Sequence, residues 1–230
     1  GKDIGDVSLI DVIEMIHKVD GIERIRMSSV EPKTLTDDFI EKLKVLPKTC
    51  RHFHLSLQSG CDETLKRMNR KYTIEEYITV VEKLRAAFPE VAITTDLIVG
   101  FPGETVEEFA QTLEFIKKIK FSHMHIFKFS PKEGTPAAKY PNQVDPRIKD
   151  ERSKIITELA EENAKEFKSN FVGKSLEVLY EQKFDKKSNN FEGLTDNYIK
   201  VISESAYDIK GKIIKTSLME VKEDYIIGKI

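Results

Sequence analysis

The sequence predicts an α/β protein in which a partial parallel (β/α) barrel is followed by a small all-β barrel. In the first two thirds of the chain, short apolar runs rich in β-branched residues alternate with longer runs whose apolar residues recur at helical spacing. This alternation favours a parallel sheet with right-handed crossovers, and strand-to-strand intervals of roughly 30 to 40 residues suit a barrel or part-barrel. From about residue 173 the pattern changes to short alternating strands separated by polar turns.

The predicted elements follow one another in a regular order. Apolar spacing predicts helices at residues 8–19, 35–46, 63–68, 73–88, 106–118 and 146–171. Strands are predicted at residues 24–30, 51–58, 93–99 and 123–130. Thr73 with Glu76, and Thr105 with Glu108, are capping boxes that mark the starts of two helices. We therefore divide the chain into a barrel part at 1–145, a connecting helix at 146–170 and a β-barrel at 171–230.

Composition excludes several classes of protein. The 230 residues carry a formal net charge of −2 and include only two cysteines. No uninterrupted apolar run is long enough to span a bilayer, and no secretory signal opens the sequence. Cys50 and Cys61 are too far apart for a CxxC motif, so neither a disulfide framework nor a finger-type metal site is supported. We expect a cytoplasmic protein with no metal ligands in this chain, and with neither a membrane nor DNA as its partner.

The predicted strands have one mostly apolar face and one polar face. Side chains alternate between the two faces of a strand, and the polar parity holds four of the five histidines. Its members are Arg24, Arg26, Ser28, His52, His54, Ser56, Gln58, Thr94, Asp96, His123, His125 and Phe127. These groups either satisfy one another as buried hydrogen bonds or line a lumen that binds a polar ligand. We favour the lumen, because the polar side chains continue to the carboxyl ends of the strands, where barrel active sites lie.

The turn after the strand at 93–99 is a candidate rim for the site. Gly100, Pro102 and Gly103 separate this strand from the next helix, whose first N–H groups are free to bind an anion. The turn is not a P-loop, because only two residues separate its glycines and Glu104 stands where that motif requires lysine. The alternative is that the two glycines only make a turn.

Six segments together resemble the radical SAM methylthiotransferase family. They are SSVEP (28–32), HLSLQSGC (54–61), MNRKYT (68–73), TTDLIVGFPGET (94–105), HIFKFSPKEGTPAA (125–138) and GLTDNYIKV (193–201). They run in order over nearly the whole chain, so the resemblance is specific. It is strongest to the branch that acts on threonylcarbamoyladenosine next to the tRNA anticodon. The branches that modify isopentenyladenosine in tRNA or an aspartate of a ribosomal protein remain alternatives.

The resemblance implies a fold, two cofactors and a partner. Residues 1–145 would be the later part of a radical SAM (β/α) barrel, and residues 171–230 an RNA-contacting TRAM domain. The family uses S-adenosylmethionine with [4Fe–4S] clusters to make a 5'-deoxyadenosyl radical, and its partner is the tRNA anticodon stem-loop. The CxxxCxxC loop that holds one cluster is absent from these residues, and two isolated cysteines cannot hold a cluster. We therefore expect the C-terminal part of a longer protein, which needs its N-terminal domain and is inactive in radical chemistry alone.

The resemblance also implies roles for individual residues, none of them catalytic in this segment. The residues implied at the S-adenosylmethionine site are Ser28, Glu31, Gln58, Ser59, Asp96, Gly100, Gly103 and Phe127. The residues implied at the substrate or RNA are His125, Lys128, Arg67, Arg70, Lys71, Tyr198 and Lys200. Tyr198 and Phe191 are the aromatic candidates for stacking on bases, and either can instead be a core residue.

Two rival hypotheses stay open. One is a binding module without chemistry, which only holds tRNA. The other is an unrelated barrel enzyme, a lyase or aldolase that uses the histidines for acid–base catalysis without iron.

Overall fold

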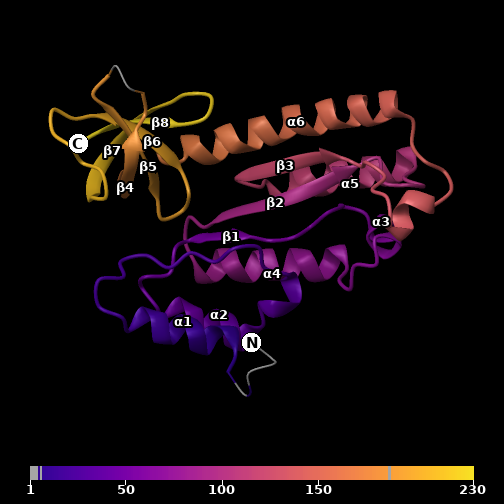
Figure 1. Ribbon diagram of the computed structural model, residues 1–230, viewed down its shortest axis with the longest axis horizontal. Coiled ribbons are helices and arrows are strands. Elements are labelled where there is room, and N and C mark those ends of the chain that lie inside the picture. The colour runs from indigo at the N-terminus through magenta and orange to yellow at the C-terminus, as the bar shows by residue number, and fades with distance from the viewer. Residues whose placement is uncertain (1–4, 6, 186–187) are drawn as a thin grey trace.

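The computed structural model describes residues 5, 7–185 and 188–230. Figure 1 shows a layered α/β part joined along helix α6 to a small β-barrel. The α/β part contains α1 Leu9–His17, η1 Pro32–Thr34, α2 Asp37–Lys44, β1 His52–His54, α3 Asp62–Arg67, α4 Ile74–Ala87, β2 Ala92–Val99, α5 Val106–Ile119, β3 His123–Lys128, η2 Pro136–Lys139 and α6 Pro146–Ser169. The barrel contains β4 Ser175–Lys183, β5 Asn190–Thr195, β6 Lys200–Glu204, β7 Ile213–Val221 and β8 Ile226–Lys229.

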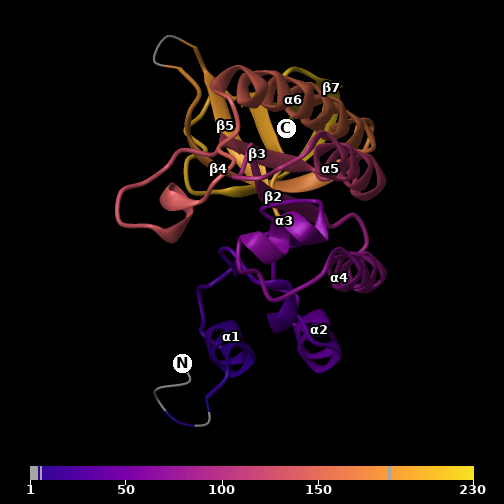
Figure 2. The same ribbon diagram turned by 90° about the vertical axis from the view of Figure 1, so that its right-hand side faces the viewer.

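The central sheet is parallel, as predicted. Its order is β1-β2-β3, and β2 pairs with β3 from Thr94 opposite His123 to Val99 opposite Lys128. The helices form an arc outside the strands and leave the other face of the sheet open (Figure 2). This arrangement is an open part-barrel.

The predicted strand at residues 24–30 is wrong as a regular strand. Only two isolated parallel bridges form there, Ile25 with Thr49 and Val30 with Leu55. Backbone hydrogen bonds join the segment to residues 48–56 only at these two points, so no continuous ladder forms between them. The predicted strand at 51–58 is likewise shortened to β1, with one further bridge between Gln58 and Leu97.

The apolar parity of the strands packs against the helices, which confirms the sequence prediction. Phe53, Leu55, Leu57 and Leu97 are fully buried, in one core with residues of α2, α4, α5 and α6. Both predicted capping boxes form: the Thr73 hydroxyl accepts from the Glu76 backbone, and the Thr105 hydroxyl from that of Glu108. These caps fix where α4 and α5 start, and the start of α5 is where the loop after β2 must end.

The C-terminal strands close into a barrel with its own core. Their order is β4-β5-β6-β8-β7, antiparallel except for the parallel pair β6 and β8. Gly193 is required on β5, because a Cβ there would lie 2.3 Å from the Leu179 carbonyl oxygen. Phe191 is only 2% exposed in this core, so of its two predicted roles the core residue is confirmed and not the stacking on RNA.

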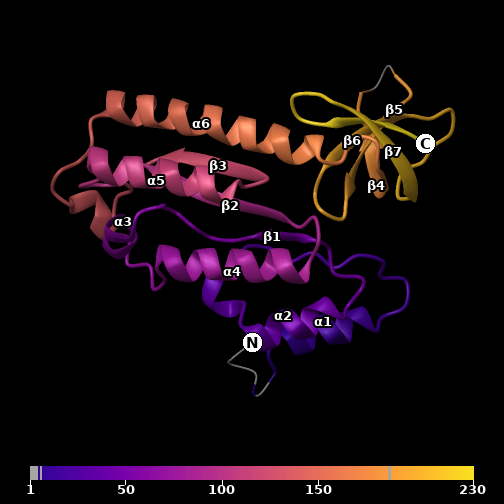
Figure 3. The same ribbon diagram turned by 180° about the vertical axis from the view of Figure 1, so that it is seen from behind.

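Helix α6 packs on the part-barrel rather than bridging solvent. Ile156 and Ala160 lie in the first core, whereas Phe171, just after the helix, lies in the core of the β-barrel. Figure 3 shows from behind how α6 runs along β3 to reach the barrel. The two parts are also tied by an ion pair in which Arg51 donates to both carboxylate oxygens of Asp196, at 2.6 and 3.0 Å. Their relative placement is therefore set by specific contacts.

Candidate functional site

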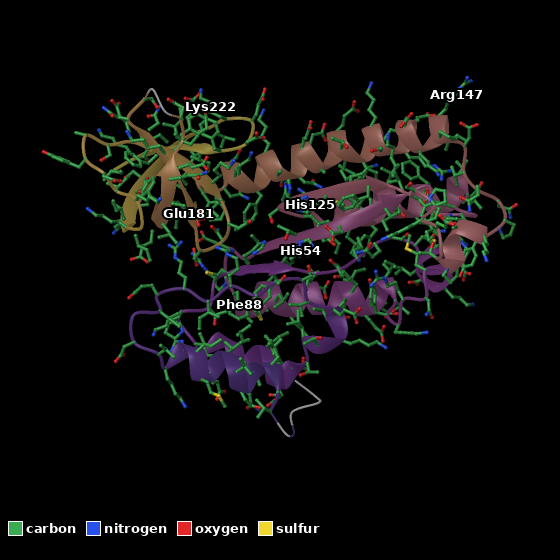
Figure 4. All side chains as sticks on the ribbon, viewed as in Figure 1. His54, Phe88, His125, Arg147, Glu181 and Lys222 are labelled. Atoms are coloured by element: carbon green, nitrogen blue, oxygen red, sulfur yellow. The ribbon has the colours of Figure 1, made fainter. Side chains whose placement is uncertain are left out.

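The polar parity of the strands gathers on the open face of the sheet. His54 on β1 and His125 on β3 lie on either side of β2, with ring centroids 6.1 Å apart (Figure 4). His54 Nε2 is 3.3 Å from the Asp96 carboxylate on β2, and Asp96 stands opposite His125 in the strand register. The row predicted from alternation is therefore a real cluster of side chains.

Thr94 joins two histidines at the centre of this face. Its hydroxyl lies 3.0 Å from His52 Nε2 and 3.0 Å from His54 Nδ1. His52 is 6% exposed, and burial, assisted by the charge of Arg26, lowers its pKa from 6.5 to about 3. His52 is therefore neutral at physiological pH, and part of the polar row does satisfy itself internally.

The carboxyl end of the predicted second strand carries a strained residue. Gln58 has a φ of 72°. Its backbone N–H donates to the backbone carbonyl of Asp96, and its own carbonyl accepts the backbone N–H of Ile98, both at 2.9 Å. Left-handed backbone is uncommon for residues other than glycine and tends to occur at functional sites. Ser59 differs from the prediction, because its side chain is 1% exposed and its hydroxyl accepts the Cys61 backbone N–H at 3.3 Å. Ser59 holds the turn and does not face the open side.

The turn from Gly100 to Glu104 is fixed from behind by α6. The buried Glu104 carboxylate accepts the Gly100 N–H at 3.0 Å and pairs with the buried Arg152 guanidinium. Burial raises the pKa of the Glu104 carboxyl, against the opposing effects of Gly100 and Arg152. Lys149 donates to the Phe129 carbonyl at 3.0 Å, and its stem would be 2.4 Å from a Cβ on Gly100. Gly100 is therefore needed for packing within the chain, which is the plainer of the two predictions for this glycine.

Arg67 also supports this turn instead of projecting toward RNA. Its guanidinium donates to both Glu108 carboxylate oxygens, at 2.8 and 2.5 Å, and lies 3.4 Å from where a Cβ of Gly103 would be. This ion pair lowers the pKa of Glu108. The prediction that Arg67 contacts tRNA phosphates thus loses its basis, since the charge is already neutralised.

The other predicted rim residues are accessible. Ser28, Phe127 and His125 are exposed, and Phe127 keeps 53% of its surface free. Two of the predicted residues pair with each other, Glu31 with Arg70 at 3.6 Å. Two more have other polar partners, Lys128 with Asp150 at 2.7 Å and Lys71 with Asn69 at 2.6 Å. Exposed pairs of this kind contribute little to stability and exchange easily for a ligand.

Tyr198 lies at the contact between the two parts of the molecule. Its ring stacks on His52 with centroids 4.4 Å apart, and the Arg26 guanidinium is 4.5 Å from its centroid. Lys200 is exposed at the start of β6. Tyr198 is thus engaged within the chain, although it is still 47% exposed.

A cavity of about 640 Å³ lies elsewhere, between β3, α6 and the β5–β6 turn. It opens beside Thr94 and His123, at the amino ends of the strands, and its lining includes Glu161, Glu181 and Glu192. In parallel α/β proteins ligands bind at the carboxyl ends of the strands, and the carboxylates of this cavity would repel RNA phosphates. We therefore place the candidate site at the rim and not in this cavity.

The sequence did not indicate that Lys149 and Arg152 of α6 hold the turn from Gly100 to Glu104, a set of contacts that we call the α6 clamp. Lys149 and Arg152 look like solvated charges on a charged helix, and only their one-turn spacing and the apolar residues nearby could have indicated burial. It also missed Arg51 and Asp196, whose pairing depends on the placement of the two parts.

Residues 5–116 match the model of the Radical SAM superfamily. This match fits a part-barrel of parallel strands with a polar inner face. This part of the chain is therefore similar to radical SAM proteins.

Individual relatives narrow this similarity. The chain is 41% identical over its whole length to the threonylcarbamoyladenosine tRNA methylthiotransferase MtaB of Bacillus subtilis, of which it covers 51%. It is also 41% identical to a tRNA-2-methylthio-N(6)-dimethylallyladenosine synthase of Acetivibrio thermocellus, covering 48% of that protein. Over 79% of the chain, identity to the Thermotoga maritima MtaB is 44%, with 42% of that protein covered. The chain is thus similar along its whole length to radical SAM methylthiotransferases, and it spans about half the length of these relatives.

The residues present fit one of the family's two cofactors. Hydrogen-bonding groups of Gln58 and Asp96 and the exposed ring of Phe127 at one rim suit a nucleoside with a charged tail. An iron–sulfur cluster does not fit, because its ligands are usually four cysteine thiolates and the chain has only Cys50 and Cys61. Within the described ranges, no group of three or more His, Cys, Asp or Glu side chains could hold a metal ion. None of the helices described here is long and apolar enough to cross a membrane.

Proposed function

We propose that this chain is the S-adenosylmethionine- and tRNA-binding half of a methylthiotransferase that adds a methylthio group to a modified adenosine next to the anticodon. The observation that carries the proposal is the polar face at the carboxyl ends of three parallel strands, in a chain that resembles tRNA methylthiotransferases along its whole length. The cytoplasm is the corresponding location.

The chain's own residues would bind and orient the cofactor. Asp96 accepts hydrogen bonds from ribose hydroxyls or the ammonium group, and Gln58, held in its strained conformation, presents its amide beside Asp96. The Gly100–Glu104 turn sets the height of the rim, and Phe127 offers an apolar surface to adenine. When bound and reduced by an iron–sulfur cluster, this cofactor supplies homolytic carbon–sulfur cleavage. The cluster ligands would come from outside these 230 residues.

The closed five-stranded barrel would serve as a TRAM domain that holds RNA. Lys200, Lys210, Lys212 and Lys215 are candidates for backbone phosphates, together with Arg70 and Lys71 near the rim. The extruded base would enter beside His125 and Lys128. Phosphate contacts of this kind give binding that weakens steeply with salt.

The N-terminal half of the protein would pack on α1. Leu9, Val12 and Met15 form an apolar stripe on this helix with 46%, 37% and 58% of their surfaces exposed, and Val19 just beyond it is 48% exposed. A row of apolar side chains at helical spacing is unfavourable in water and indicates a covered face. The division at residues 1–145, 146–170 and 171–230 then leaves the first part incomplete without that partner.

The test is a chimera in which this chain replaces the matching C-terminal half of the B. subtilis relative. The chimera is expressed in cells that lack the enzyme, and tRNA nucleosides are analysed by mass spectrometry. We expect 2-methylthio-threonylcarbamoyladenosine to return with the wild-type chain and not with Asp96→Ala. A methylthio group on dimethylallyladenosine would move the assignment to the other branch, and loss of modification in a folded, tRNA-binding chimera would support the binding module without chemistry.

A further inference from the structure

We infer that Tyr198 is a positioning residue for the cofactor face: it holds His52, two hydrogen bonds of fixed direction connect His52 through Thr94 to His54, and His54 in turn lies against the Asp96 carboxylate. The inference deepens the proposed function, since it concerns how Asp96 is aimed. It changes the role of Tyr198 from a contact with RNA to a contact between the two parts of the protein.

The backbone of Tyr198 is held in place by its own turn. Its φ is 66°, an uncommon value for an aromatic residue, and its N–H donates to the Thr195 carbonyl at 3.1 Å. The Thr195 hydroxyl donates to Asn197 at 2.6 Å and accepts the Ile199 N–H at 2.9 Å. Asn197 in turn donates to the Glu90 carbonyl on the other part of the molecule, at 3.2 Å. The turn is therefore rigid and anchored at the interface.

The ring of Tyr198 covers His52 by nearly parallel stacking. The interplanar angle is 20° at the 4.4 Å centroid separation, and the Arg26 guanidinium lies against the same ring. Stacking fixes the plane of the imidazole and keeps water from it, which agrees with the 6% exposure of His52. Without this ring, His52 would be free to rotate and to become hydrated.

When the imidazoles of His52 and His54 are both neutral, their neighbouring groups allow only one arrangement of the protons. The Asp96 carboxylate, 3.3 Å from His54 Nε2, favours a proton on that nitrogen, so Nδ1 of the neutral ring carries the lone pair. The Thr94 hydroxyl must then donate to His54 Nδ1, and its oxygen accepts from His52 Nε2–H. His52 Nδ1 is left as a buried acceptor, and it has no hydrogen-bond partner among the described residues. Both imidazoles are therefore Nε2–H tautomers, locked through a single hydroxyl.

The consequence is that the aim of Asp96 depends on where the C-terminal barrel sits. A shift of the β5–β6 turn would move the Tyr198 ring, release His52 and loosen Thr94 and His54 in sequence. The ion pair between Arg51 and Asp196, two residues before Tyr198, resists such a shift. The domain proposed to hold RNA is in this way connected to the residue proposed to hold the cofactor.

The test is long-range proton–nitrogen correlation NMR on the ¹⁵N-labelled 230-residue chain at pH 7, which reports histidine tautomers directly. For the wild type we expect His52 and His54 both as fixed Nε2–H tautomers. Tyr198→Phe should keep these nitrogen shifts, because the ring and not its hydroxyl makes the contact. Tyr198→Ala should move the shifts of both residues toward the averaged values of a hydrated imidazole.

Two further variants keep the inference falsifiable. Tyr207→Ala removes an 82% exposed tyrosine from a neighbouring loop of the barrel and should change neither histidine. Thr94→Val keeps the shape of the side chain but removes the hydroxyl that joins the two imidazoles. It should therefore change the nitrogen shifts of His54, while the ring of His52 stays stacked on Tyr198. Unchanged His52 and His54 shifts in Tyr198→Ala, or an Nδ1–H tautomer of His54 in the wild type, would overturn the inference.

A separate titration with S-adenosylmethionine distinguishes this inference from the proposed function. We expect Tyr198→Ala to bind the cofactor about threefold more weakly than Tyr198→Phe. If the tautomers change as expected but the affinity for the cofactor does not, the role proposed for Asp96 is contradicted. The connection from Tyr198 through His52 and Thr94 to His54 would still be supported.

Discussion

His52 should make the stability of this protein depend on pH well above the range in which carboxylates titrate. In the folded protein its pKa is about 3, whereas in the unfolded chain it returns to about 6.5. As pH falls below 6.5, the unfolded chain binds a proton that the folded protein cannot, so unfolding becomes more favourable. With these two values, lowering the pH from 7 to 5 removes about 2 kcal/mol of stability through this one side chain.

The measurement is urea unfolding at pH 7, 6 and 5 for the wild type and His52→Gln. Glutamine places its amide nitrogen where Nε2 lies, so it can still donate to Thr94, but it does not titrate. His123, whose pKa is also lowered mainly by burial, is present in both proteins and cancels in the difference. We expect the stability of the wild type to fall by about 2 kcal/mol more than that of His52→Gln over this range. Parallel pH dependences for the two proteins would refute the assignment of a buried neutral imidazole at this position.

Three other predictions concern the α6 clamp and the RNA surface. Arg152→Met should lower the free energy of unfolding in urea by about 3 kcal/mol, because it leaves the Glu104 carboxylate buried and unpaired. Lys117→Ala, which breaks an exposed pair, should lower it by less than about 1 kcal/mol. Equal losses in the two variants would contradict the α6 clamp. Gly100→Ala should lower the melting temperature more than Gly134→Ala, because both glycines have positive φ but only Gly100 faces Lys149; similar melting temperatures would mean that this packing is unimportant. Lys200→Ala should weaken binding of an anticodon stem-loop and reduce the slope of log affinity against log salt by about one, with Lys118→Ala on α5 as the control; an unchanged slope would remove Lys200 from the interface.

Most of the part-barrel could be predicted because its signals are local. Capping boxes at Thr73 and Thr105 and the alternation within residues 93–99 depend only on neighbouring residues, and the structure confirms them. The strand predicted at 24–30 failed because the segment pairs with residues 48–56 only at Ile25 and Val30, and a local pattern does not report how regularly two segments pair. The polar face could be predicted for the same reason as the sheet, since residues two apart in each strand share a side.

The parts of the site that could not be predicted depend on contacts between distant segments. Arg152 and Lys149 lie on a helix rich in exposed charge, and nothing in their local sequence distinguishes them from solvated lysines and arginines. Tyr198 is an aromatic residue in a turn, as expected of a residue that stacks on bases. Its contact with His52 exists only because the barrel is fixed against β1. Arg67 was expected at phosphates from the resemblance to the family, but the carboxylate that neutralises it comes from α5. In each case the missing information is the position of an oppositely charged or aromatic partner.

All the roles proposed above depend on S-adenosylmethionine binding at the carboxyl-end rim of the part-barrel. This binding can be measured directly by titrating the ¹⁵N-labelled chain with the cofactor and following backbone amide shifts, with Asp96→Asn as the matched control. We expect shifts concentrated at Gln58, Asp96 and residues 100–104, and smaller shifts in Asp96→Asn. Shifts confined to the acidic cavity beside His123, or none at saturating cofactor, would contradict it.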